Sequence, residues 1–167
     1  MKYKKIVILN LLFGLLIMLS ACGSSGNSNP VSAIQEQKVS ETDQEGETQE
    51  MLCLKIDNTN ISVDWEDNES IKALKQLCQN KPLSINMHKY GGFEQVGSIG
   101  STIPSNDNHI TTESGDIMLY SSNQIVVFYG SNSWSYTRLG KISDKTNGEL
   151  KELLDNSNVT ITLSLVK

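Results

Sequence analysis

The sequence has little of the chemistry on which metal proteins and many enzymes depend. It contains three cysteines, three prolines, two histidines and a single arginine. No Cys-x-x-Cys spacing occurs, and the two histidines, His88 and His109, are isolated from each other and from the cysteines. This pattern does not predict a metal site, so we expect no metal and no cofactor. Nothing in the net charge of −5 favours nucleic acid, which requires a clustered basic surface.

The chain also lacks an apolar run as long as the roughly 20 residues of a membrane-spanning helix. The apolar run at residues 6–19 is shorter, follows Lys2, Lys4 and Lys5, and is followed by small residues rather than a second basic flank. This three-part layout is typical of an export signal, which we place at residues 1–21.

The segment that closes this signal, LSAC at residues 19–22, resembles the lipobox of bacterial lipoproteins. The resemblance implies that the Cys22 thiol receives a diacylglyceryl group and becomes the new N-terminus after cleavage. We therefore predict a lipoprotein that carries lipid, including palmitate, on Cys22 and is anchored at the extracytoplasmic face of the cell membrane. The alternatives are an ordinary signal peptide or an uncleaved anchor, with Cys22 incidental.

Residues 22–50, which we call the tether, lack the apolar side chains needed to form a core. The tether has no aromatic residue and carries six acids against one base, Lys38. Such a composition predicts a disordered, extended and solvated linker. Removal of the three signal lysines takes the formal charge from −5 to −8, of which −5 lies in the tether and −3 in residues 51–167.

Residues 51–167 form one domain's worth of sequence with short alternating apolar patterns. Residues 51–57 and 61–65 predict a hairpin with a turn at 58–60, and the polar stretch 104–113 predicts a loop. A helix capped by Asp67 or Asn68 is expected to extend to Cys78, with Leu77 on its apolar face, and a second helix capped by Thr146 or Asn147 is expected to end at Leu154. Further strands are expected at 83–90, 96–103, 116–120, 124–129, 134–142 and 158–166.

This order of elements predicts a mainly β fold: a closed barrel with two short helices. Several segments, in this order, resemble the bacterial and archaeal cyclophilin-like domain family, a compact relative of the cyclophilin barrel. They are ISV at 61–63, YGGFE at 90–94, GDIMLY at 115–120, VFYG at 127–130 and LGKI at 139–142. The resemblance covers nearly all of residues 51–167 and implies a cyclophilin-like barrel.

True cyclophilins are prolyl cis/trans isomerases that use an arginine, and this chain departs from that pattern. The Phe-His-Arg segment of the enzymes is missing, and the single arginine, Arg138, stands in WSYTRLG at 134–140, a position that does not match the catalytic arginine. We therefore expect a module that binds a peptide, an exported protein or a small ligand. The alternatives are a weak prolyl isomerase and a domain that serves a redox partner, since family members are sometimes joined to flavodoxin-like domains.

The candidate site residues follow from side-chain chemistry. An arginine presents a rigid fork of donors, and aromatic side chains are enriched at binding surfaces. Arg138 and Glu94 are the catalytic candidates; Glu94 could form a general-base pair with Asp116, although Asp116 could instead accept hydrogen bonds from the preceding turn. A solvated strand arginine and aromatic residues that only fill the barrel are the alternatives. The candidate ligand-binding residues are Tyr90, Tyr120, Tyr129, Trp134, Tyr136 and Arg138.

The domain's two cysteines leave one question open. Export would permit a disulfide between Cys53 and Cys78, but Cys53 lies in a predicted strand and Cys78 on the apolar side of a predicted helix. In such places a free cysteine acts as a small hydrophobic residue, so the pairing is not decided by the sequence.

Overall fold

The computed structural model describes residues 50–166, which belong to a compact unit formed by Glu45–Lys167. The predicted signal, the lipid site at Cys22 and the tether up to residue 49 lie outside the described residues. None of the helices within residues 50–166 is long and apolar enough to cross a membrane.

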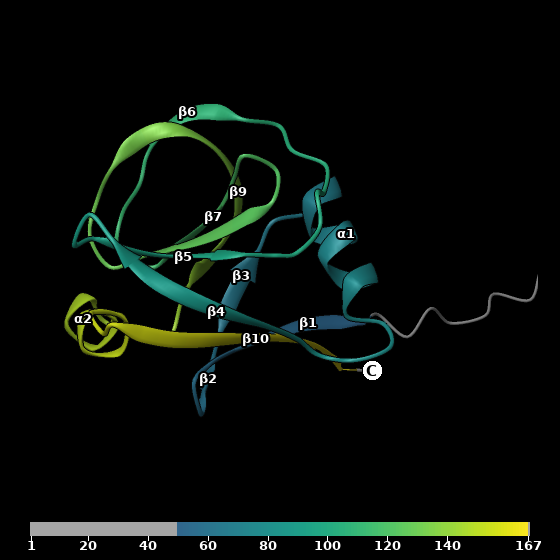
Figure 1. The fold of residues 1–167 in the computed structure, drawn as a ribbon, viewed down its shortest axis with the longest axis horizontal. Coiled ribbons are helices and arrows are strands. Elements are labelled where there is room, and N and C mark those ends of the chain that lie inside the picture. Colours follow the sequence, from purple (N-terminus) through teal and green to yellow (C-terminus); the bar gives the residue numbers. More distant parts are fainter. Residues whose placement is uncertain (1–49, 167) are drawn as a thin grey trace, which may run out of the picture. The chain divides into compact units, whose positions relative to one another are not determined.

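The described residues form a ten-stranded antiparallel sheet that curls into a nearly closed barrel with two short helices, as predicted (Figure 1). The strand order is β2-β1-β10-β4-β5-β8-β7-β9-β3, and β6 pairs with β9 off this path. The strands are β1 (Met51–Ile56), β2 (Thr59–Ile61), β3 (Val63–Trp65), β4 (Leu83–Tyr90), β5 (Glu94–Ser98), β6 (Asn108–Thr111), β7 (Asp116–Tyr120), β8 (Gln124–Phe128), β9 (Ser133–Ile142) and β10 (Asn158–Val166).

A side chain bridges the seam where the barrel is not closed by strand pairing. Trp65, at the end of β3, donates a hydrogen bond from its indole Nε1 to the backbone oxygen of Leu52 on β1, at 2.7 Å. The backbone of β3 pairs on its other side with β9, where Val63 faces Ile142. The bond therefore joins β3, at one end of the strand order, to β1, which is second from the other end.

The inner face of the barrel forms the main core, because apolar residues alternate along the strands. On β8, Ile125 and Val127 point into this core, whereas Val126 and Phe128 belong to a separate cluster on the outer face. This central strand pairs with β5 and β7 and is covered on both faces, as its continuous apolar run predicted.

The helices α1 (Glu69–Leu77) and α2 (Asn147–Leu154) lie at different ends of the barrel and add apolar side chains to the main core (Figure 1). Asn68 caps α1 by accepting from the backbone N–H of Ile71 at 3.0 Å. Thr146 caps α2 through a capping box with Glu149. In each case one of the two predicted caps is confirmed.

The structure corrects four predictions. The turn after β1 is at Asp57 and Asn58, and the expected strand 61–65 is divided: β2 pairs with β1, whereas β3 pairs with β9. The predicted loop 104–113 contains β6, which pairs with β9. Leu77 is exposed, because α1 buries Ser70, Ile71 and Leu74 instead. The strand expected at 96–103 begins at Glu94 and ends at Ser98.

Cys53 and Cys78 are both free. Cys78 is buried in the main core, where its thiol contacts the backbone oxygen of Leu163 at 3.6 Å, and burial raises the pKa of the thiol. Cys53 lies between Leu52 and Leu54 on β1, and these two leucines are the residues that point inward. Because neighbouring strand residues face opposite sides, Cys53 faces away from Cys78.

Candidate binding groove on the outer face of the barrel

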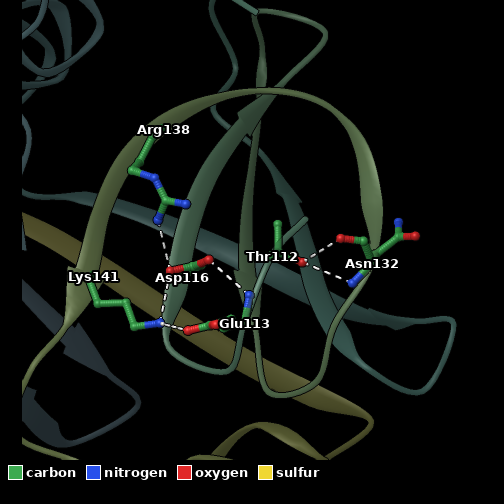
Figure 2. A network of polar contacts seen from close by, with 6 residues as sticks. All are labelled: Thr112, Glu113, Asp116, Asn132, Arg138 and Lys141. Carbon is green, nitrogen blue, oxygen red and sulfur yellow. Dashed lines mark hydrogen bonds and ion pairs between the residues drawn. The ribbon is translucent and has the colours of Figure 1, made fainter. Parts of the chain in front are cut away.

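The candidate site is built where β9 leaves the barrel wall and curves over the outer face of the sheet (Figure 2). The second apolar cluster lies between this segment and the sheet, with Tyr136 contributed by β9 and Val96, Met118, Val126 and Phe128 by the sheet beneath. The strand β6 pairs with the first half of β9, from Asn108 opposite Tyr136 to Thr111 opposite Ser133. The start of β9 is therefore a two-stranded arch rather than a free loop.

Hydrogen bonds hold the beginning of this arch in place. The Thr112 side chain accepts from the backbone N–H of Asn132 at 2.9 Å and donates to the backbone oxygen of the same residue at 3.0 Å (Figure 2). The backbone N–H of Thr112 donates to that oxygen as well, at 2.8 Å. Thr112 is fully buried. These contacts hold the chain just before Trp134 and Tyr136 in position.

Ion pairs hold the other end of the arch to β7. Asp116, only 3% exposed, accepts from Arg138 Nη1 at 2.8 Å and lies 3.0 Å from Lys141 Nζ (Figure 2). Its second oxygen accepts from the backbone N–H of Glu113 at 2.9 Å. Burial acts to raise the pKa of the Asp116 carboxyl, but these three donors lower it by more, so the pKa lies below its usual value.

A groove with a volume of about 410 Å³ lies between the arch and the sheet. It is formed by strands β4, β5, β7 and β8, the arch and the residue before it. It is lined by His88, Tyr90, Glu94, Val96, Tyr120, Gln124, Val126, Asn132, Trp134 and Tyr136. A volume in this range is that of a small-ligand site.

Strand register explains why these residues meet. Opposite residues in an antiparallel pair share a face, and Tyr90 on β4 lies opposite Glu94 on β5, which lies opposite Phe128 on β8. In the next row, His88 faces Val96, which faces Val126. Both rows lie on the outer face, beneath the arch.

Four aromatic side chains form much of the wall of this groove. Tyr136 is buried and makes edge-to-face contacts with Tyr120, at 6.0 Å between ring centroids, and with Phe128, at 5.6 Å. Asn132 Nδ2 donates to the Tyr136 hydroxyl at 3.1 Å. Trp134 and Tyr90, by contrast, are 56% and 62% exposed and stand at the rim. The groove thus has a fixed inner aromatic wall and two exposed aromatic side chains at its edge.

Glu94 is the unusual polar residue of the groove. It is 5% exposed, and its Oε2 has no hydrogen-bond partner in the part of the chain that the structure describes. Burial raises the pKa of this carboxyl to about 7. An unpaired acid in an aromatic pocket is costly to ionise, and such residues are found more often at functional sites than elsewhere.

The structure brings together five of the predicted site residues and separates the others. Tyr90, Glu94, Tyr120, Trp134 and Tyr136 all line the groove. Sequence reasoning missed His88, Val96, Gln124, Val126 and Asn132. Alternation along β4 puts His88 on the same face as Tyr90, but Gln124 meets Tyr120 only through the register of β8 with β7, which was not available from the sequence.

Two of the predicted ligand-binding residues do not line the groove. Tyr129 follows β8 and lies in the main core, 7% exposed. Arg138 lines a second, polar cavity of about 650 Å³, together with Asp67, Asn68 and Ser105 among others. It forms an ion pair with Asp116 and is not among the residues that line the groove.

The general-base pair proposed for Glu94 and Asp116 is not formed. Glu94 is on β5 and Asp116 on β7, with β8 between them. The alternative role for Asp116 is confirmed by the hydrogen bond from the Glu113 N–H in the preceding turn. Within residues 50–166, no three His, Cys, Asp or Glu side chains lie close enough together to hold a metal ion.

The fold and groove define a small antiparallel barrel with a candidate ligand site on its outer face. Residues 54–164 match the model of the Cyclophilin-like family, and the chain belongs to this family. No curated protein and no solved structure shows a significant match to the chain.

Proposed function

We propose that this cyclophilin-like domain is a binding module whose ligand occupies the groove beneath the β9 arch. The observation that carries the proposal is the convergence of Trp134, Tyr136, Tyr120 and Tyr90 around the buried carboxyl of Glu94. Binding pockets are concave and mostly apolar, with a few polar groups that orient the ligand. The groove has this composition.

The geometry also indicates the size of the ligand. A volume of about 410 Å³ accommodates a small molecule or one or two side chains of a peptide. The exposed rings of Trp134 and Tyr90 at the rim offer contact area to the atoms that flank the inserted group. A peptide segment of an exported protein or a small ligand would fit this arrangement.

Prolyl isomerisation is the alternative function, because an X-Pro peptide could also lie on the aromatic wall. Arg138 gives this alternative no support, since it lines the second cavity and pairs with Asp116. The groove donors are the amides of Asn132 and Gln124, the hydroxyls of the tyrosines, the indole N–H of Trp134 and the ring N–H of His88. An isomerase would have to weaken amide conjugation with these groups.

We further propose that the domain is held at the extracytoplasmic face of the membrane by a lipid on Cys22. The support is the order of the basic residues, the apolar run and the LSAC segment in the first 22 residues, followed by the acidic tether. A lipid anchor would leave the domain in water with its groove accessible to soluble ligands.

The binding proposal is tested by titrating the full-length chain, purified in a non-ionic detergent, with a panel of short peptides and small amines, acids and alcohols. Calorimetry measures binding in every variant, because it does not depend on the side chain that is changed. Trp134→Ala should weaken any binding by at least about tenfold, as for an aromatic residue that dominates an interface. Ser135→Ala, an exposed neighbour that does not line the groove, is the matched control. Equal binding by both variants would refute the groove as the site.

The isomerase alternative is tested in the same preparation with X-Pro tetrapeptides of varied X. Acceleration that is lost in Trp134→Ala and retained in Arg138→Ala would establish isomerisation in the groove. The absence of acceleration across the series would leave a binding module.

The anchor is tested by mass spectrometry of membrane-extracted protein. A lipoprotein should have lost residues 1–21 and gained the mass of a diacylglyceryl group, and Cys22→Ala should leave the precursor uncleaved. An unmodified Cys22 in the extracted protein would refute the anchor.

A further inference from the structure

We propose that the groove selects ligands that present a protonated alkylamine, such as a lysine side chain or a free primary amine, which would pair with Glu94. This inference deepens the proposed function and depends on it, because it assigns the ligand chemistry of the same groove.

The Glu94 carboxyl is buried and has an oxygen without a hydrogen-bond partner among the described residues. Oε2 of Glu94 is buried without a hydrogen-bond partner among residues 50–166, and the residue is 5% exposed. A buried ionised carboxylate without a partner is strongly disfavoured, whereas one that is paired with a cation and hydrogen-bonded is not. A ligand cation at this position would supply the missing partner.

Aromatic rings line the groove around the Glu94 carboxyl. Tyr90 lies opposite Glu94 in the register of β4 and β5, and Tyr136 and Trp134 reach the groove from the arch. The face of an aromatic ring attracts a cation within about 6 Å of its centroid, most strongly when both are removed from water. A carboxylate and several rings together favour an ammonium group over a neutral or anionic one.

No lysine or arginine lines the groove, so no side chain there competes with a ligand cation for Glu94. The titratable groups that line it with Glu94 are His88 and Tyr90 from β4, Tyr120 from β7 and Tyr136 from the arch. None of the lining residues is a lysine or arginine. Lys89, which precedes Tyr90 on β4, alternates to the other face and pairs with Asp155. The −3 charge of residues 51–167 also favours cationic ligands.

The experiment uses three probes on the full-length chain in non-ionic detergent at pH 8, with calorimetry and tryptophan fluorescence as readouts. N-acetyl-lysine methylamide carries the cation. Its 6-hydroxynorleucine counterpart has the same heavy-atom count with a neutral hydroxyl in place of the ammonium. n-Butylamine carries the lysine side chain without the peptide, so it separates a peptide source from a free-amine source.

We expect the lysine probe to bind at least about tenfold more tightly than the hydroxynorleucine probe, because charge-assisted hydrogen bonds are about twice as strong as neutral ones. Glu94→Gln should remove this preference, whereas Glu152→Gln, which removes the same charge from the exposed surface of α2, should retain it. n-Butylamine bound as tightly as the lysine probe would assign the site to free amines, and weaker binding would assign it to lysine-containing peptides.

A pH series adds a second signature. With the pKa of Glu94 near 7 in the free protein, the carboxyl is about nine-tenths ionised at pH 8 and one-tenth at pH 6. Lysine-probe affinity should therefore fall about ninefold from pH 8 to pH 6, while the neutral probe should change little. His88→Gln is the control, because His88 is the imidazole that lines the same groove, and the fall should persist in this variant.

The outcomes separate the two proposals. If the neutral probe binds wild-type protein as tightly as the lysine probe, the groove is a binding site but amine selectivity is overturned, and this comparison needs no variant to fold. If none of the three probes binds and the wider panel also fails, both proposals are refuted. Lysine binding that survives Glu94→Gln with its preference intact would also overturn the assignment to Glu94.

Discussion

Arg138 donates from Nη1 to Oδ1 of Asp116 at 2.8 Å, so the single arginine of the chain holds β9 to β7. The carboxylate is 3% exposed and the guanidinium is partly exposed. The pair lies at the end of the arch that roofs the groove (Figure 2). The arginine expected to be a candidate for catalysis therefore has a structural position.

Arg138→Ala should lower the free energy of unfolding by about 1–3 kcal/mol, because Asp116 would remain buried with one hydrogen bond fewer. Lys141 Nζ, 3.0 Å from the carboxylate, would keep part of the pairing. Urea unfolding of the full-length chain in detergent measures the effect. Lys72→Ala removes an exposed ion pair with Glu69 and should cost less than about 0.5 kcal/mol. Equal effects of the two variants would contradict the structural role.

Glu94→Gln should change how stability depends on pH. Because burial raises the folded pKa from 4.5 to about 7, the folded state holds this proton to higher pH than the unfolded state. The Glu94 proton contributes fully to the free energy of unfolding below pH 4.5, and this contribution is lost as the pH rises to 7. Between pH 5 and pH 8 the wild type should lose about 2 kcal/mol of stability for this reason.

Urea unfolding at pH 5 and pH 8 tests this. The variant should lose less stability than the wild type over this interval and should be the more stable of the two at pH 8. Glu152→Gln, an exposed acid, should follow the wild type. Parallel pH profiles for wild type and Glu94→Gln would show that Glu94 ionises freely in the folded protein.

Trp65→Phe should weaken the seam of the barrel. The change keeps an aromatic ring but removes the Nε1 donor to the Leu52 oxygen, at a cost of about 1–3 kcal/mol for a lost hydrogen bond and an unsatisfied acceptor. Amide hydrogen exchange should become faster in β1 and β3 than in the central strand β8. Trp134→Phe, at an exposed position, should change stability by less than about 0.5 kcal/mol.

Gly97→Ala should destabilise the barrel by about 1–3 kcal/mol. A Cβ at this position would lie 2.5 Å from Met87 Sδ, 2.6 Å from Ile85 Cγ2 and 3.0 Å from a backbone oxygen. Gly148→Ala is the matched control, because it lies in α2 with its nearest neighbour at 4.0 Å and should stabilise the helix by up to about 1 kcal/mol. Thermal unfolding that ranks the two variants in the opposite order would contradict the packing described here.

The alternation of apolar residues predicted most strands and both helices, because a half-buried element must repeat its apolar positions with its own period. The same reasoning predicted that β8 is covered on both faces, since Ile125 to Phe128 are all apolar. It missed β6, in which only Ile110 is apolar and the other three residues are polar and exposed, and whose pairing with β9 depends on backbone hydrogen bonds. Because almost every residue can form backbone hydrogen bonds, such pairing leaves no pattern of side chains in the sequence.

The sequence predicted the residue types of the candidate site but not their arrangement in space. The residue types that converge in the groove, tyrosines, a tryptophan and a glutamate, were identifiable as suitable for binding. Arg138 and Tyr129 were equally suitable by residue type, but the ion pair of Arg138 with Asp116 and the burial of Tyr129 in the main core keep both out of the groove. Both depend on segments that are distant in the chain, so no local sequence pattern predicts them.

Local periodicity, caps and the family motifs were sufficient to establish a mainly β, cyclophilin-like barrel with two helices, because these features depend on residues close together in the chain. The pairing of β3 with β9, the arch and the burial of Glu94 depend on contacts between distant segments. Burial of a carboxyl is a property of everything packed around it, so the groove and its unpaired acid became visible only when the strands were assembled in register.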